Sequence, residues 1–327
     1  MKRYPTIKGW GKYLPEKVLT NYDLQKKLDT SDAWIYSRTG IRERRIAADE
    51  ETASTMGAKA GELALKIAGI EPQELDLIIV ASCTADKIFP ACASLIQNQL
   101  GAKRAGAFDI NAACSGFLPA LASACQFIQG GTFNNILVVG TEVYSRIIDW
   151  QDRNTCILFG DGAGAVVLQG TERSMRLPSF VIGSDGSKAD LLYVPGVCDA
   201  ISNMPADGHY YLRMDGHAVF KFAVQCMSKA TLQAIEAAGL SPEDIDLFIP
   251  HQANRRIMNA IAKAVGIPQE KVFINVDRYG NTSAASIPIA LCEALEEERL
   301  AEGSYFALAA FGGGFSWGAG VLQWSLG

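Results

Sequence analysis

The sequence predicts an α/β protein built from two similar halves, and three observations support that prediction. Apolar runs typical of buried strands alternate with amphipathic helix patterns along most of the chain. Residues 71–84 (EPQELDLIIVASCT) and 241–254 (SPEDIDLFIPHQAN) share a Pro-acid turn followed by Asp, Leu, an apolar residue and Ile. The same order then follows each segment: a helix, a glycine, a strand and a proline early in the next helix. A repeat of this length indicates two similarly folded units that pack together, not a solenoid of short repeats.

The first half, residues 1–172, carries most of the strand and helix signals. Its first 50 residues combine short strand-like pieces with a charged segment, SDAWIYSRTGIRERRI. The later signals predict helices at 52–68 and 92–100, a buried strand within 71–84, a strand end near 107–110, and strands at 135–140 and 165–169. Such uniformly apolar strands are typical of central positions in a sheet.

The second half, residues 173–327, repeats this order, but fewer of its helices and strands can be predicted. We expect a connector at 171–215, a helix at 255–265, a strand at 272–275 and then Pro288 early in a further helix. Asp76 to Pro119 spans 43 positions and Asp246 to Pro288 spans 42, so the two halves keep nearly the same spacing.

Composition argues against several classes of protein. The net charge of −5 lacks the basic excess of nucleic-acid-binding proteins. No apolar run approaches the length of about 18 residues that spans a bilayer, and the first 18 residues lack the apolar core of a secretory signal. The eight cysteines are scattered, without a CxxC pair and apart from the three histidines, which argues against a disulfide framework or a zinc site. We therefore expect a cytoplasmic protein with reduced thiols and no nucleic-acid, membrane or metal partner.

Cys114 lies where a predicted strand passes into a helix. Small residues surround it, and an amphipathic helix with Pro119 in its first turn follows. The positive end of that helix and its unpaired N–H groups favour a thiolate, so Cys114 is a candidate nucleophile, with a buried structural cysteine as the alternative. The repeat favours the nucleophile, because His251 follows the corresponding part of the other half and ligands of α/β layers gather at strand carboxyl ends.

His251 and Asn281 supply the polar groups that a thioester reaction needs. His251 follows Pro250, which ends a strand, and we expect it to open the helix of PHQANRRIMNAIAKAV. Asn281 lies in a Gly-Asn turn that leads into another helix. Beside a thiolate that accepts an acyl group, an imidazole and an amide can donate hydrogen bonds to a developing enolate oxygen. A structural histidine near a cap and a turn or cap asparagine are the alternatives.

Two glycine-rich segments lead to different predictions. FGGGFSWGAG (311–320) permits close backbone approach, so one of its N–H groups can join the Cys114 N–H in an oxyanion hole, with a tight structural turn as the alternative. FGDGAGAVVLQG (159–170) lacks the lysine and the helix of a phosphate loop, and we expect it to be structural. His209 and His217 are expected to be surface or packing residues.

Six segments occur in a characteristic order over nearly the whole chain: SDAWIYSRTGIRERR, DINAACSGF, FGDGAGA, HQAN, YGNTSAASIP and GGGFSWG. In this order they resemble β-ketoacyl-acyl-carrier-protein synthase III, a family of thiolase-like condensing enzymes. The resemblance implies a thiolase-like fold, in which two βαβαβαββ halves form a five-layered αβαβα sandwich. It also implies a decarboxylative condensation of a short acyl-CoA, such as acetyl-CoA, with malonyl-acyl-carrier protein. That reaction gives 3-oxoacyl-acyl-carrier protein and starts type II fatty-acid synthesis.

The resemblance also implies a ping-pong cycle without a metal or redox cofactor. In it Cys114 is the acyl acceptor, His251 and Asn281 assist decarboxylation, and Gly313 joins the Cys114 N–H in the oxyanion hole. The implied binding residues are Trp34 and Arg153 at the adenine of coenzyme A, Arg38 near the nucleotide, Phe220 and Asn254 in the pantetheine tunnel, and Phe89 at the acyl pocket of the partner subunit in a homodimer.

An acidic carrier protein implies a basic docking surface on this chain. The candidates are Lys221, Arg255, Arg256 and Lys263, although an ordinary solvated helix face also explains Arg255 and Lys263. The first alternative function is a thiolase-like acyltransferase or condensing enzyme of secondary metabolism, of polyketide or quinolone type. A non-catalytic carrier-protein partner is the second, and Cys114 argues against it. The preferred acyl group depends on Phe89 and on residues 190–215, and the sequence leaves it open.

Overall fold

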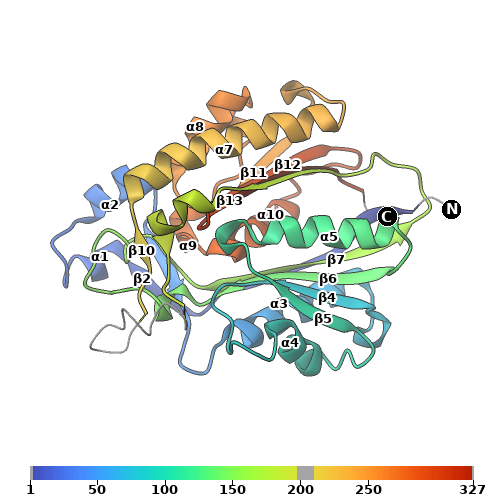
Figure 1. Ribbon diagram of the computed structural model, residues 1–327, viewed down its shortest axis with the longest axis horizontal. Coiled ribbons are helices and arrows are strands. Elements are labelled where there is room, and N and C mark those ends of the chain that lie inside the picture. Colours follow the sequence, from blue (N-terminus) through green and yellow to red (C-terminus); the bar gives the residue numbers. More distant parts are fainter. Residues whose placement is uncertain (1–2, 197–209, 326–327) are drawn as a thin grey trace.

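The computed structural model describes residues 3–196 and 210–325, and its elements stack in five layers (Figure 1). Helices cover both outer faces, and further helices lie between the two sheets. The layers are α7 (Gly216–Ala237) with α8 (Arg255–Val265), a sheet containing β11 to β13, α5 (Phe117–Gln129) with α10 (Ser286–Glu296), a sheet containing β4 to β7, and α3 (Ala53–Ala68) with α4 (Cys92–Leu100). The predicted five-layered sandwich is confirmed.

The first sheet has five strands in the order β1-β7-β6-β4-β5. β4 pairs in parallel with β5 and β6, whereas β7 runs antiparallel to β6 and β1. The strands are β1 (Tyr4–Tyr13), β4 (Leu77–Ala81), β5 (Gly106–Ile110), β6 (Asn135–Glu142) and β7 (Gly162–Thr171). Every residue of β4 is buried, as its uniformly apolar sequence predicts.

The second sheet repeats this topology. Its order is β11-β12-β13-β8, in which β11 and β12 are parallel and β13 is antiparallel to β12 and β8. The strands are β8 (Ser179–Ser184), β11 (Leu247–Pro250), β12 (Tyr305–Gly312) and β13 (Ser316–Gln323). They correspond to β1, β4, β6 and β7 of the first sheet, so the internal repeat found in the sequence is a structural repeat.

Two predicted elements of the second half are wrong. The strand expected at 272–275 is reduced to one parallel bridge between Phe248 and Val272. The next backbone groups are engaged by a side chain instead, because the Gln252 amide donates to the Phe273 carbonyl at 3.1 Å and accepts from the Asn275 N–H at 2.9 Å. The connector expected at 171–215 contains β8, a half-exposed edge strand whose mixed sequence lacks a uniform apolar run.

The central helices α5 and α10 bring the two halves together. Both bury apolar side chains in one core with the inner faces of the two sheets, including Phe117, Leu121, Ile287 and Leu291. The contact is close enough to require glycine, since a Cβ at Gly164 of β7 would lie 2.6 Å from the Ile289 N. The first turn of α10 is thereby fixed against β7 of the first half.

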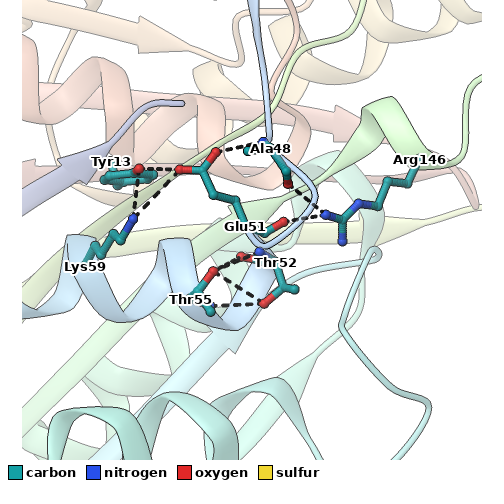
Figure 2. Close-up of polar contacts among 7 residues, drawn as sticks. All are labelled: Tyr13, Ala48, Glu51, Thr52, Thr55, Lys59 and Arg146. Carbon is teal, nitrogen blue, oxygen red and sulfur yellow. Dashed lines mark hydrogen bonds and ion pairs between the residues drawn. The ribbon is translucent and has the colours of Figure 1, made fainter. Parts of the chain in front are cut away.

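Polar contacts fix the start of α3 (Figure 2). Thr52 caps the helix: its side chain accepts the Thr55 N–H, and the Thr55 hydroxyl accepts the Thr52 N–H at 2.8 Å. The neighbouring Glu51 carboxylate accepts hydrogen bonds from the Tyr13 hydroxyl and the Ala48 N–H. Lys59 lies over the Tyr13 ring and 3.8 Å from Glu51, which ties α3 to β1.

The structure also contains smaller elements. They are β2 (Lys17–Thr20), α1 (Asn21–Leu24), α2 (Asp32–Thr39), β3 (Glu43–Ile46), β9 (Leu192–Tyr193), β10 (Arg213–Met214) and α9 (Val276–Tyr279). Of these, α1, α2, β2 and β10 lie at the left end of the molecule in Figure 1. Within residues 3–196 and 210–325, no helix is both long enough and apolar enough to span a bilayer. In the same ranges seven cysteines are free thiols, while Cys198 and His209 lie outside the described residues.

Candidate active site

One cavity of about 1020 Å³ receives residues from both halves. Cys114, His251, Asn281 and Gly313 all line it, although 199 positions separate the first from the last (313 − 114). Other lining residues are Trp34, Arg38, Cys83, Asn111, Tyr144, Phe159, Leu192, Phe220, Asn254 and Arg256. The structure therefore brings the predicted chemical groups to one site.

Cys114 lies on a tight turn, Ala113–Ser115, directly before α5. Ala113 has φ of 45°, an uncommon conformation for alanine that turns the chain sharply into the helix. The Cys114 Sγ lies 3.2 Å from the Ser283 Oγ and 3.9 Å from the Tyr144 hydroxyl. Burial raises the pKa of the thiol to about 11, although the hydrogen bond from Ser283 opposes that rise.

His251 lies in the loop after β11, and the expectation that it opens a helix is wrong. α8 begins at Arg255, because the Asn254 side chain caps it by accepting the Arg256 N–H at 2.8 Å. The His251 N–H donates to the Ala309 carbonyl at 2.7 Å, which fixes the loop to β12. Its ring lies in the cavity wall and is 3% exposed.

The contact with Ser286 is the basis for assigning the proton of the His251 ring. The Nδ1 atom is 2.6 Å from the Ser286 Oγ, and that oxygen also accepts the Gln252 N–H at 3.4 Å. The Ser286 hydroxyl can donate to Nδ1 while its oxygen accepts the Gln252 N–H, and on this arrangement we assign the ring proton to Nε2. Burial lowers the pKa of His251 to about 3, so the ring is neutral and Nε2–H is a donor.

The backbone of Asn281 is held by Leu158 and by Gly160 of the segment FGDGAG. Its N–H donates to the Leu158 carbonyl at 2.8 Å, and its carbonyl accepts the Gly160 N–H at 3.0 Å. The side-chain oxygen accepts the Ser283 N–H at 2.8 Å, which leaves the amide NH₂ as the group available to the cavity. Asp161 binds the Ala47 and Ser145 N–H groups, so the structural interpretation of this segment is confirmed.

The glycine-rich turn between β12 and β13 lies against Cys114. A Cβ at Gly312 would lie 2.6 Å from the Cys114 N, so only glycine fits at this contact. Gly313 lines the cavity beside it. The Ser316 hydroxyl donates to the Ala112 and Gly313 carbonyls at 2.9 and 3.0 Å and thereby joins this turn to the Cys114 turn. Sequence reasoning identified Gly313 but missed Gly312.

Aromatic and basic residues gather at the cavity mouth. The Arg38 and Arg153 guanidinium groups lie 5.4 and 5.5 Å from the Trp34 ring centroid. Arg256, which is exposed, lies 5.7 Å from the Phe220 ring. The Asn254 amide donates to the Arg38 carbonyl at 3.1 Å and so connects α8 to α2. His217, the exposed second residue of α7, also lines the cavity.

The remaining predicted residues lie away from the cavity. Lys221 and Lys263 are exposed on α7 and α8. The half-buried Arg255 side chain instead donates to the Tyr36 hydroxyl at 3.1 Å and lies 4.0 Å from the Asp277 carboxylate. Phe89 is 83% exposed, in a segment absent from the cavity wall.

Comparison with known proteins identifies the family. The family model of 3-oxoacyl-[acyl-carrier-protein] synthase III matches residues 108–186, and the model of its C-terminal part matches 235–324. The β-ketoacyl-[acyl-carrier-protein] synthase III of Roseiflexus sp. strain RS-1 is 49% identical over 99% of this chain and 100% of its own length. The chain belongs to the β-ketoacyl-[acyl-carrier-protein] synthase III family.

Solved structures agree with this family. The 3-oxoacyl-[acyl-carrier-protein] synthase III of Aquifex aeolicus VF5 has a TM-score of 0.92 and 49% identity, over 98% of this chain and 100% of that one. The priming β-ketosynthase of the R1128 polyketide pathway is similar in fold, with a TM-score of 0.94, but only 36% identical, over 99% and 97% of the two chains.

Sequence reasoning missed a buried polar cluster behind Cys114. Glu142, the last residue of β6, is fully buried and accepts the Ser283 hydroxyl at 3.1 Å and the Cys83 Sγ at 3.2 Å. Tyr144 places its hydroxyl 3.1 Å from both Ser283 and Cys83, with its ring stacked on Phe159. Burial raises the pKa of Glu142 to about 7. The signal in the sequence was a glutamate two residues after the apolar run ILVVG of β6.

Proposed function

We propose that this chain condenses a short acyl-CoA with malonyl-acyl-carrier protein and so performs the first condensation of type II fatty-acid synthesis. The observation that carries the proposal is the convergence of Cys114, His251 and Asn281, from two halves of the chain, on one cavity. A lone buried cysteine needs no such partners, whereas thioester condensation needs a nucleophile and donors for an enolate oxygen. The family of the chain supports the same reaction.

In the first half-reaction, Cys114 attacks the thioester carbon of acyl-CoA and coenzyme A leaves. The turn conformation holds the Sγ at the start of α5, where the helix N-terminus stabilises developing negative charge. We assign the oxyanion hole to the N–H groups of Cys114 and Gly313, which belong to adjoining turns. The product is S-acyl-Cys114.

In the second half-reaction, malonyl-acyl-carrier protein loses CO₂ and the resulting carbanion attacks the Cys114 thioester. Negative charge develops on the malonyl thioester oxygen as the carbon–carbon bond to CO₂ breaks. The neutral His251 donates from Nε2, and Asn281 donates from its amide NH₂. We propose that no metal or redox cofactor takes part, because the thioester activates the acyl group and the loss of CO₂ supplies the carbanion.

We propose that the cavity mouth binds coenzyme A and the pantetheine arm of the carrier protein. The Trp34 ring offers a stacking surface for adenine, and Arg38 and Arg153 beside it supply positive charge for phosphates. Phe220 and Asn254 line the route inward to Cys114. Exposed Phe89 is our candidate for reaching the acyl pocket of a partner subunit in a homodimer. The chain is proposed to act in the cytoplasm.

Mass spectrometry and CO₂ release test this function together. Mixing the chain with acetyl-CoA should add one acetyl group to the peptide that contains Cys114. Subsequent malonyl-acyl-carrier protein should release CO₂ and discharge the adduct as 3-oxoacyl product. An adduct without CO₂ release would support an acyltransferase of secondary metabolism instead, and absence of an adduct would refute both enzymes. Rates with isobutyryl- and longer acyl-CoAs define the acyl preference.

The docking proposal concerns Lys221, Arg256 and Lys263, because Arg255 is engaged by Tyr36 and Asp277. Arg256→Glu should weaken use of malonyl-acyl-carrier protein about tenfold or more and leave acylation by acyl-CoA much less affected. Lys66→Glu on α3, an exposed lysine on the opposite outer layer, is the matched control. Equal losses in both half-reactions for Arg256→Glu would contradict the docking role.

A further inference from the structure

The acylation of Cys114 leaves one proton without an assigned acceptor. Cys114 carries a thiol whose pKa burial raises to about 11, so the sulfur must lose its proton as it attacks. His251 cannot readily take that proton, because its free Nε2 already carries one and burial opposes an imidazolium. Another group has to accept the proton, and this requirement rests on the function proposed above.

A hydrogen-bonded path leads from Cys114 to a buried carboxylate. The Ser283 Oγ lies 3.2 Å from the Cys114 Sγ and 3.1 Å from the Glu142 Oε1. The hydroxyl has one proton and can donate it to either group; when it donates to Glu142, its oxygen can accept the proton from the Cys114 sulfur. We propose that Ser283 and Glu142 form a proton relay that converts Cys114 into its nucleophilic thiolate during acylation.

The transfer balances in atoms and charge. The Cys114 proton moves to the Ser283 oxygen and the Ser283 proton moves to Glu142, as the Sγ–C bond to the acyl group forms. The bond from that carbon to the coenzyme A sulfur then breaks, and Glu142 gives up its proton through Ser283 to the departing coenzyme A sulfur in place of Cys114. Net, Cys114–SH and acyl-CoA give S-acyl-Cys114 and coenzyme A, with Glu142 again a carboxylate. A single negative charge is present throughout: it is on Glu142 before and after the step, and on the thioester oxygen while Glu142 holds the proton.

The surroundings of Glu142 suit an acceptor that holds and releases a proton. Thr84 donates its hydroxyl to Oε2, and the Cys83 N–H lies 3.3 Å from both oxygens. Among the described residues, the titratable groups that interact electrostatically with Glu142 are Cys83, Cys92, Cys114 and Tyr144. Within the described ranges no basic side chain forms an ion pair with it. With its pKa raised to about 7, Glu142 is poised to exchange protons at neutral pH.

The pH profile of Cys114 alkylation tests the relay without any acyl-CoA. In the wild-type chain, iodoacetamide modification of the Cys114 peptide should rise with a midpoint near pH 7, where Glu142 becomes a carboxylate, and rise again near pH 11. Glu142→Gln removes the acceptor and should abolish the neutral-pH phase, with alkylation at pH 8 slowed at least tenfold. Asp161→Asn, which replaces another fully buried carboxylate, is the matched control and should keep that phase.

Ser283→Ala tests the path with the carboxylate in place. Ser283 has φ of 50°, and Ala113 adopts φ of 45° at the corresponding turn, so alanine is compatible with this backbone. The variant should lose most of the neutral-pH phase, as Glu142→Gln does. If Glu142→Gln or Ser283→Ala folds and still shows the alkylation phase near pH 7 at the wild-type rate, the relay is refuted. Acetyl transfer to wild-type Cys114, followed separately, reports on the proposed function, so failure of one proposal is distinguishable from failure of the other.

Discussion

The turns that precede the two central helices share one backbone design and differ in what they carry. The first turn, residues 111–116, leads into α5, and the second, residues 281–286, leads into α10. Each begins with an asparagine whose side-chain oxygen accepts the N–H two residues later, at 3.3 Å in the first turn and 2.8 Å in the second. That later residue has positive φ in both turns, 45° at Ala113 and 50° at Ser283.

The difference lies in single side chains. The first turn places a thiol at Cys114, whereas the second has Ala284 at the same position and offers Asn281 and Ser283 to the thiol instead. The end of one strand from each half contacts the turn of the other half. Gly312 of β12 lies against the first turn, and Glu142 of β6 contacts the second. One duplicated scaffold thus supplies the nucleophile from the first half, and His251, Asn281 and Ser283 from the second.

Removing the thiol should have the largest effect. Cys114→Ala should abolish the acyl adduct and lower condensation by at least about 10⁴-fold, as expected for loss of a covalent nucleophile. Ala284→Cys in the Cys114→Ala chain should not restore the adduct, because position 284 is 1% exposed and absent from the cavity wall. Adduct formation at the thiol introduced in the second turn would show that the turn backbone alone makes a nucleophile.

Replacing each of the two asparagines with aspartate should separate their roles. Asn281→Asp keeps the oxygen that accepts the Ser283 N–H but replaces the NH₂ donor, so decarboxylation should fall about 10²–10³-fold while acylation changes much less. Asn111→Asp makes the same substitution at an exposed position and should cost less than tenfold. Single-turnover CO₂ release and adduct formation measure both steps, and similar losses for the two variants would contradict the division of labour.

The features that could be predicted from the sequence are those that periodic patterns and motifs encode, namely helix bounds and the residues of the site. α4 and α8 have the predicted bounds, and Cys114, His251, Asn281 and Gly313 do meet at one cavity. The strand at 272–275 could not be excluded from sequence, because a distant side chain, Gln252, takes over its backbone groups. Glu142 was missed for a similar reason: its partners Cys83, Thr84 and Ser283 come from three-dimensional packing and follow no local pattern.

Replacing Gly312 or Gly140 with alanine should test how closely each turn packs against a strand of the opposite half. A Cβ at Gly312 would lie 2.6 Å from the Cys114 N, and one at Gly140 would lie 2.4 Å from the Ala284 oxygen. Each alanine variant should lose about 1–3 kcal/mol of unfolding free energy. Gly312→Ala displaces the nucleophile and should also slow acylation more than Gly140→Ala does. Denaturant unfolding and adduct formation by the folded fraction give the two quantities, and equal slowing would contradict the comparison.

The buried ionisable groups of the two halves should give stability opposite dependences on pH. His251 has a folded-state pKa of about 3 against 6.5 in model compounds, so between these values only the unfolded chain binds the proton and stability falls as pH falls. Glu142 has a folded-state pKa of about 7 against 4.5, so there only the folded chain holds the proton and stability falls as pH rises. Each group changes the free energy of unfolding by about 2 kcal/mol between pH 5 and 6.5. In the wild-type chain the two changes have opposite signs. His251→Gln should therefore become less stable as pH rises from 5 to 6.5, and Glu142→Gln more stable. Denaturant unfolding at both pH values measures these changes. If the stability of both variants changed with pH in the same direction, the opposite pKa shifts of His251 and Glu142 would be contradicted.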